Sequence, residues 1–177
     1  MKERTMKKKP SEIITERLSM HSYRDSDMET AIKLLCNDNI KKTYMIPDFY
    51  SREDAVKMFY KINDWSHSDE HFEYGIYLKD QLIGFINDVE TDDESIEIGY
   101  VIHPDMQGRG YATEILSAAI RELFSMGYSV VKAGSFEENI ASKRVMVKCG
   151  MRMVEKTDSI KYQGKIHRCL YYEIRKE

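Results

Sequence analysis

The chain has 177 residues, of which 42% are hydrophobic and 32% charged, and this composition suits one folded domain and disfavours intrinsic disorder. A net charge of -3 gives no broad excess of lysine and arginine, so nucleic acid is not an expected partner. Cys36, Cys149 and Cys169 are far apart and form no CxxC pair, so the sequence suggests neither a disulfide framework nor a thiolate metal site and favours a reducing compartment.

The first ten residues are basic, but no apolar stretch of the signal-peptide type follows them. Nowhere do about 20 apolar residues follow one another, as a membrane-spanning helix requires. We therefore expect a basic, disordered tail over residues 1–10 and one domain over residues 11–177. We also expect a cytoplasmic protein with no membrane contact.

Hydrophobic periodicity predicts the elements in chain order. Residues 13–23 predict a strand, and residues 25–38 carry apolar side chains at helical spacing. Ser51 stands three residues before Asp54, which is a capping-box arrangement that opens a second helix, and the region before it is expected to be irregular. Three β-rich runs then predict an antiparallel meander: residues 71–78, 82–89 and 95–102.

The clearest helix covers residues 111–126 and closes at Gly127. A strand, a long helix and a strand in succession normally form a right-handed parallel crossover. The sequence therefore predicts an α/β (α+β) domain with a mixed sheet of about seven strands and about four helices. The remaining predicted elements are a strand at 129–133, a helix at 139–148 ended by Gly150, and strands at 151–156 and 166–174.

The run Gln107-Gly108-Arg109-Gly110-Tyr111-Ala112 lies between the third meander strand and this helix. Two glycines allow a sharp turn and close backbone approach to a ligand, and the free amides and dipole of the helix start favour an anion. Arg109 adds a positive charge. A pyrophosphate fits this loop, although the loop can also simply join strand to helix. The Walker Lys-Ser/Thr is absent and Thr113 replaces the third glycine of a dinucleotide loop, which disfavours ATP and NAD.

These residues resemble the GNAT superfamily of acetyl-CoA-dependent N-acetyltransferases. Gln107, Gly110 and Ala112 match its pyrophosphate pattern Gln/Arg-x-x-Gly-x-Gly/Ala. The preceding Ile98-Gly99-Tyr100-Val101-Ile102-His103-Pro104 and the later Asn139-Ile140-Ala141-Ser142 and Lys148-Cys149-Gly150-Met151 are similar to the branch with the ribosomal-protein alanine acetyltransferases. The resemblance spans Ser11 to the C-terminus. It implies a single-domain, mostly antiparallel sheet with a splayed central strand pair.

The resemblance also implies ligands. The co-substrate would be acetyl-CoA, with no metal. Val101 and Ile102 would present backbone groups to the pantetheine arm and thioester, where an N–H can stabilise developing negative charge. Asn139 would contact the pantetheine, although asparagine is equally a good helix cap. The pyrophosphate would be held by the amides of Gln107, Gly108, Arg109, Gly110, Tyr111, Ala112 and Thr113.

Two residues are candidates for proton transfer. Glu97 resembles in position a glutamate that histone-type members use as base, and strand alternation places it on one face with Gly99 and Val101. Ser142 matches a serine proposed in the ribosomal branch to protonate the departing thiolate. The alternatives are a solvated strand carboxylate and a capping or packing serine. The tyrosine that serves as acid in other relatives would fall at Met146, which has no proton to give.

We therefore expect an N-acetyltransferase that moves an acetyl group from acetyl-CoA to a primary amine by direct attack in a ternary complex. At pH 7 an α-amine is neutral in roughly one molecule in six to ten and a lysine amine in about one in 2,500, so an N-terminus needs less help from a base. A protein N-terminus and a small-molecule amine are both candidate acceptors. The acceptor gate is expected in residues 37–65 and the C-terminal hairpin.

The sequence leaves open both the class of the protein and its oligomeric state. A non-catalytic acyl-CoA-binding or regulatory module of the same fold is the alternative to an enzyme, and a nucleotide-binding protein is a third reading. The sequence also leaves open whether the chain forms a homodimer.

Overall fold

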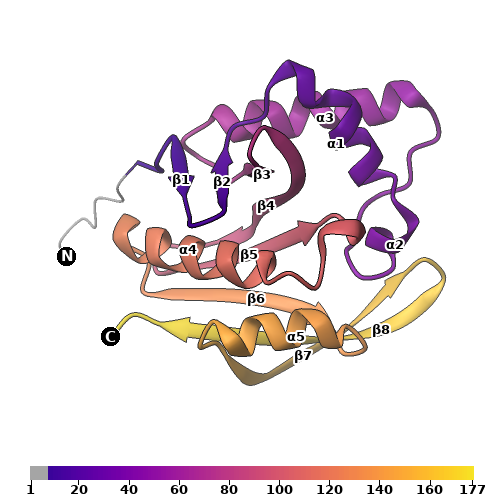
Figure 1. The fold of residues 1–177 in the computed structure, drawn as a ribbon. Helices are drawn as coiled ribbons and strands as arrows, with labels where there is room; N and C mark the ends of the chain where they lie inside the picture. Colours follow the sequence, from indigo (N-terminus) through magenta and orange to yellow (C-terminus); the bar gives the residue numbers. More distant parts are fainter. Residues whose placement is uncertain (1–7) are drawn as a thin grey trace.

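The structure is a computed structural model that describes residues 8–177, and a single eight-stranded sheet runs through it (Figure 1). The strands are β1 (Glu12–Ile14), β2 (Leu18–His21), β3 (Tyr74–Leu78), β4 (Gln81–Thr91), β5 (Ser95–Ile102), β6 (Val130–Phe136), β7 (Arg152–Tyr162) and β8 (Lys165–Arg175). The helices are α1 (Met28–Leu35), α2 (Asp38–Lys41), α3 (Arg52–His67), α4 (Tyr111–Met126) and α5 (Ile140–Lys148), with 3-10 turns η1 (Asp25–Asp27) and η2 (Pro104–Met106).

The strands lie in the order β1-β2-β3-β4-β5-β6-β8-β7. Every neighbouring pair is antiparallel except β5 and β6, which α4 connects as a parallel crossover. β5 pairs with β6 only over Ser95, Ile96 and Glu97. Beyond Glu97, β5 stays on β4 as far as Ile102 while β6 stays on β8 as far as Phe136. The sheet therefore opens between β5 and β6, and the predicted splayed pair is confirmed.

Helices cover both faces of the sheet and bury two apolar clusters. One cluster joins the sheet to α4 and α5, and the other joins it to α1, α2 and α3. Ile115, Leu116 and Leu123 of α4 are fully buried, because apolar residues recur along one side of this helix. The helix ends at Gly127, which adopts a left-handed φ of +118°.

The mixed sheet and its flanking helices are confirmed, with differences in detail. The structure has eight strands rather than about seven because residues 13–23 form the β1–β2 hairpin instead of one strand. It has a further short helix, α2, in the region expected to be irregular; Asn37 caps it through its side-chain oxygen. β7 and β8 extend to Tyr162 and Lys165, where the chain reverses over Gln163 and Gly164, both with positive φ.

The predicted tail boundary at residue 10 falls too late. Residues 1–7 lie outside the described part of the chain, but Lys9 is buried and its Nζ donates to Ser66 O at 2.8 Å. That carbonyl belongs to the last turn of α3, whose dipole favours a cation. Pro10 O accepts from Tyr74 Oη at 2.6 Å. Lys9 and Pro10 therefore belong to the folded domain, because burial of the ammonium is compensated by these carbonyl groups.

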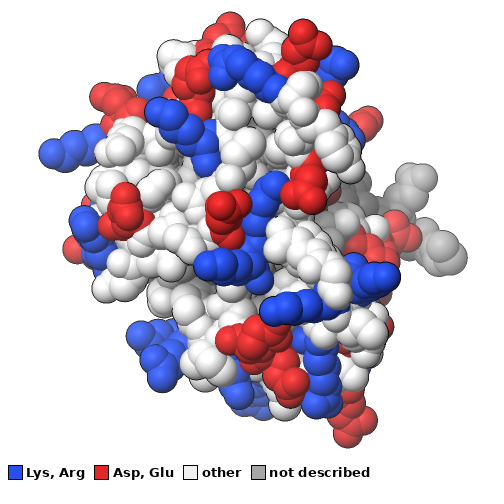
Figure 2. All heavy atoms as spheres, turned by 90° about the vertical axis from the view of Figure 1, so that its right-hand side faces the viewer, with Lys and Arg blue, Asp and Glu red and all other residues white. Residues whose placement is uncertain are grey.

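Acidic and basic side chains are interspersed over the face drawn in Figure 2, in keeping with the small net charge. Within residues 8–177, no helix is long and apolar enough to cross a membrane. The same residues contain no group of three or more histidine, cysteine, aspartate and glutamate side chains suited to a metal ion.

Truncation of the α4 core should destabilise the fold strongly. Ile115→Ala removes a fully buried side chain between helix and sheet, and we expect a loss of about 2–5 kcal/mol in unfolding free energy, measured by urea denaturation. The control is Ile14→Ala, since 74% of Ile14 is exposed, and its effect should stay within about 0.5 kcal/mol. Equal losses in the two variants would contradict this assignment of the core.

Candidate active site

The loop between β5 and α4 forms a turn that can receive an anion. Gly108 (φ +75°) and Gly110 (φ +81°) adopt a conformation that residues with a Cβ rarely adopt. Gly110 is the N-cap of α4, and the first helical hydrogen bond runs from Glu114 N to Gly110 O. The amides of residues 111–113 precede this ladder at the positive end of the helix dipole, which is the arrangement that binds phosphate groups.

A brace from the β1–β2 turn holds this loop in place. Arg17 donates to the Glu114 carboxylate through its backbone N (2.8 Å) and its Nε (2.7 Å), and through Nη1 to Arg109 O (2.9 Å). Thr15 Oγ1 donates to the same carboxylate at 2.6 Å. The turn therefore ties the anion-binding loop to the edge of the sheet. No local sequence signal marks Arg17, because its partners lie more than 90 residues away.

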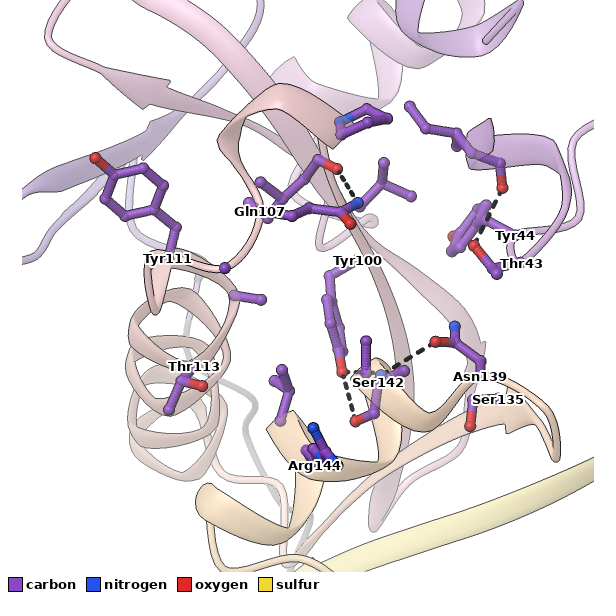
Figure 3. A pocket seen from close by; sticks show the side chains of 18 of the residues that line it. Thr43, Tyr44, Tyr100, Gln107, Tyr111, Thr113, Ser135, Asn139, Ser142 and Arg144 are labelled. Carbon is purple, nitrogen blue, oxygen red and sulfur yellow. Dashed lines mark hydrogen bonds between the residues drawn. The ribbon is translucent and has the colours of Figure 1, made fainter. Parts of the chain in front are cut away.

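A cavity of about 630 Å³ opens in front of the loop (Figure 3). It runs from the start of α4, along the free edge of β5, to the first turns of α5. The predicted residues that line it are Val101, Ile102, Gln107, Gly108, Gly110, Tyr111, Ala112, Thr113, Asn139 and Ser142.

The positive charges at this cavity differ from those predicted. Arg109 does not line the cavity, because its side chain turns back to donate to Asp105 O at 3.3 Å. Arg144 and Lys148 of α5 do line it. These two residues are four positions apart, so they share a face of the helix that Asn139 begins. This four-residue spacing is the sequence signal that indicates the pair, which was not among the predicted site residues.

The end of β5 presents its backbone to the cavity in a defined way. The Val101 carbonyl points towards β4, since a Cβ built on Gly84 would clash with its oxygen. Antiparallel strands alternate the direction of their polar groups, so the backbone groups of Ile102 turn to the open side. Ile102 O accepts from Gln107 Nε2 at 2.9 Å. This hydrogen bond from Gln107 fixes the end of the strand. Val101 and Ile102 were both predicted to present backbone groups to the cavity, and it is the amide of Ile102 that faces it.

The start of α5 brings Asn139 and Ser142 to the other side of the cavity. Asn139 Oδ1 accepts from Ser142 N at 3.1 Å, so its capping role is present. Ser142 Oγ lies 3.0 Å from the hydroxyl of Tyr100, a β5 residue whose side chain crosses the splay towards α5 (Figure 3). Burial raises the pKa of Tyr100 to about 12. Tyr100 belongs to the motif noted in the sequence, but no role was assigned to it.

A second cavity of about 460 Å³ shares its inner wall with the first. Gly99 of β5 and Gly134 of β6 line both cavities, so the two spaces meet where the strands have separated. Glu97 lines the second cavity, and its Oε1 lies 3.4 Å from the position that a Cβ on Gly134 would occupy. The Glu97 carboxylate therefore stands at the junction.

The environment of Glu97 favours proton uptake. Burial raises the pKa of this carboxyl above its usual range, and the negative charges of Glu90 and Asp158 add to the rise. Lys156 and Lys132 oppose it. A carboxylate with a raised pKa at the junction of two cavities is a candidate acid–base group on physical grounds.

Tyr44 lines both cavities, and Tyr162 contacts the Tyr44 segment from outside their lining. Tyr44 packs over Gly99 and donates to Asn87 Oδ1 at 2.6 Å. Tyr162, at the tip of the β7–β8 hairpin, donates to Tyr44 O at 3.2 Å and accepts from Ile46 N at 3.4 Å. The hairpin and the segment after α2 therefore meet at the mouth of the cavities, in the two regions from which an acceptor gate was expected.

Known proteins resemble this chain in sequence and in fold. The sequence profile of the acetyltransferase (GNAT) domain matches residues 17–152. The chain is 32% identical over 144 residues to the uncharacterized N-acetyltransferase YnaD of Bacillus subtilis, covering 79% of this chain and 82% of that protein.

Solved structures agree in fold. An acetyltransferase of the GNAT family from Bacillus anthracis has a TM-score of 0.79 at 25% identity, over 93% of this chain and 98% of that one. The ribosomal L7/L12 alpha-N-protein acetyltransferase RimL, solved in complex with coenzyme A, has a TM-score of 0.81 at 16% identity, over 96% of this chain and 98% of that one.

Substitution of Gly99 tests how tightly the junction is packed. A Cβ at Gly99 would collide with the Tyr44 hydroxyl, so we expect Gly99→Ala to lower the unfolding free energy by about 1–3 kcal/mol in urea denaturation. Tyr44→Phe removes the colliding oxygen. The double variant should therefore lose less than the sum of the single variants, and strict additivity would contradict the proposed collision.

Proposed function

The chain belongs to the acetyltransferase (GNAT) family and is an acetyltransferase, and from this premise we propose that it transfers the acetyl group of acetyl-CoA to a primary amine by direct attack in a ternary complex. The observation that carries the proposal is the separation of β5 from β6. It leaves one cavity beside the anion-binding loop and a second beside Glu97, and Gly99 and Gly134 line both of them. Two substrates can thus meet from opposite sides.

Acetyl-CoA would occupy the larger cavity. The amides at the start of α4 suit the pyrophosphate, and Arg144 and Lys148 add positive charge on the facing helix. Asn139 would contact the pantetheine while it caps α5. Arg109 would act through its backbone amide, because its side chain is engaged with Asp105.

The amide of Ile102 would receive the thioester oxygen. This N–H faces the cavity from a strand that is fixed on β4 and, through Ile102 O, on Gln107. A donor held in place before the reaction stabilises the negative charge that develops when an amine attacks the carbonyl carbon. The C–N bond then forms, the C–S bond breaks, and its electron pair goes to sulfur.

Glu97 would accept the surplus proton of the attacking amine. Its carboxylate lies at the junction of the cavities, and its raised pKa brings its proton affinity closer to that of an amine near neutral pH. Ser142, across the larger cavity, would donate a hydrogen bond from its hydroxyl to the departing sulfur. Glu97 lines the smaller cavity and Ser142 the larger one, so the two groups would serve the amine and the sulfur separately.

The acceptor would enter the smaller cavity past Tyr44 and Tyr162. An N-terminal α-amine is the favoured acceptor, because a useful fraction of it is neutral at pH 7. The alpha-N-protein acetyltransferase among the structural relatives supports this choice of acceptor. A small primary amine is the other candidate that a cavity of about 460 Å³ accommodates.

Binding of acetyl-CoA can be measured by calorimetry. We expect a low-micromolar Kd, about -8 kcal/mol, with ADP much weaker. Arg144→Ala and Lys148→Ala should each weaken binding by about two- to fivefold at low salt, and less at high salt. Lys143→Ala is the matched control, because Lys143 is exposed on the same helix outside the cavity lining. Absence of binding to folded protein would reject the assignment of the cavity.

Acetyl transfer is tested by release of free CoA in the presence of peptides with N-terminal serine or alanine, polyamines and small amines. The base must be ionised, so the rate should rise with pH through the raised pKa of Glu97. Glu97→Gln should lower kcat by about 100-fold and remove this acidic limb.

Glu90→Gln provides the control for the pH effect. Loss of the nearby negative charge should lower the pKa of Glu97, so the acidic limb should move to lower pH and remain visible. An unchanged profile in Glu97→Gln would remove Glu97 from the mechanism. Binding of acetyl-CoA without CoA release for any amine would instead identify a non-catalytic module.

A further inference from the structure

The contact between Tyr100 and Ser142 joins the strand that carries the open edge to the helix across the cavity. Tyr100 Oη lies 3.0 Å from Ser142 Oγ and 3.4 Å from Ser142 O. Both residues line the larger cavity, and both side chains are labelled in Figure 3. Among the described residues, these two atoms are the hydrogen-bond partners of the Tyr100 hydroxyl.

The direction of this hydrogen bond follows from the donor strength of the two groups. A phenol is a stronger donor than an aliphatic alcohol, and a buried phenol needs an acceptor for its single hydrogen. Both atoms within hydrogen-bond distance of Tyr100 Oη belong to Ser142, and Oγ at 3.0 Å is a nearer acceptor than the carbonyl oxygen at 3.4 Å. Burial raises the pKa of Tyr100 to about 12, so the phenol keeps its hydrogen and remains a donor near neutral pH.

With Tyr100 as donor, Ser142 Oγ becomes the acceptor and its own hydrogen must point elsewhere. The backbone N–H of Ser142 is already used by Asn139 Oδ1 at 3.1 Å, so the first turn of α5 is fixed. Ser142 Oγ has no other hydrogen-bond partner among the described residues, so its hydrogen can point into the cavity that Ser142 lines. A negatively charged hydrogen-bond acceptor in that cavity would meet a hydroxyl hydrogen that is already oriented towards it.

We propose that Tyr100 is a positioning residue that donates to Ser142 Oγ and thereby aims the Ser142 hydroxyl hydrogen at the sulfur that leaves acetyl-CoA. This inference rests on the proposed function. As the C–S bond breaks, its electron pair goes to sulfur, and Ser142 stabilises the thiolate by a hydrogen bond. Tyr100 keeps its proton, and the proton lost by the amine passes through Glu97 to solvent. The free thiolate takes its final proton from water after release.

The test measures the thiol of bound CoA rather than turnover. The ultraviolet absorbance of the thiolate is titrated against pH in the CoA complex, with the desulfo-CoA complex as baseline. A donor aimed at sulfur stabilises the thiolate, so it should hold the thiol pKa below that of free CoA. Cys149, the other titratable group close to Tyr100, is present in both complexes and cancels.

The variants are Ser142→Ala, Tyr100→Phe and the double variant. We expect Ser142→Ala to raise the bound thiol pKa by about one unit and Tyr100→Phe by about half a unit. In the Ser142→Ala background, Tyr100→Phe should have no further effect, because it acts through the serine. Tyr172→Phe is the control: it removes a buried hydroxyl that has no hydrogen-bond partner among the described residues, and it should change nothing.

Two results would overturn the inference. One is an unchanged thiol pKa in Tyr100→Phe with CoA affinity retained, and the other is an equal shift with and without Ser142. Failure of the proposed function is distinguishable from both. If Ser142→Ala leaves the thiol pKa unchanged, both the role of Ser142 and the inference built on it are rejected, while acetyl-CoA binding and CoA release report separately on the activity.

Discussion

A parallel strand pair that holds together over three positions and then separates is the constraint on which the site depends. Separation exposes backbone groups that a continuous ladder would satisfy, which normally costs free energy. The protein tolerates this because β5 remains bonded to β4 and β6 to β8 along the open stretch. A register shift in β4 between Asp88 and Glu90, opposite Glu97, bends the sheet at the same level. The opening therefore lies between two intact half-sheets.

Two glycines and the tyrosines that pack over them shape the opening between β5 and β6. Gly99 and Gly134 carry no side chain where the cavities meet, and Tyr44 and Tyr171 pack over the space that this leaves. Gln107 and Arg17 fix the strand end and the anion-binding loop from opposite sides. These two side chains hold the backbone in fixed positions, and under the proposed function its amides would need no rearrangement during the reaction.

Local sequence signals predicted the elements that follow from periodicity and capping. The bounds of β5 and α4 were predicted to the residue, because a glycine or a turn stands at their ends. The β1–β2 hairpin was read as one strand, since its reversal at residues 15–17 contains neither glycine nor proline. The four-residue α2 is too short to produce a helical period. Local patterns thus fail where an element is defined by its distant partners.

The candidate site divides in the same way. The anion-binding loop, Asn139 and Ser142 lie in contiguous motifs, and their positions around one cavity could be predicted. Tyr100 is adjacent in sequence to Gly99 but acts on α5, 42 residues later. Tyr162 meets the segment after α2 across 116 or more residues. No local period encodes such contacts, because they follow from the order of strands in the sheet.

The Tyr162 contact has a consequence for how this protein can change over evolutionary time. The residues that meet there come from the β7–β8 hairpin and from the segment after α2, whereas the anion-binding amides come from the start of α4. Substitutions or length changes in the first two segments can accumulate without altering the glycine turn at the start of α4, which is the proposed pyrophosphate site. These two segments can therefore diversify while the start of α4 is retained, so that under the proposed function descendants would keep the same acyl donor and acquire new acceptors.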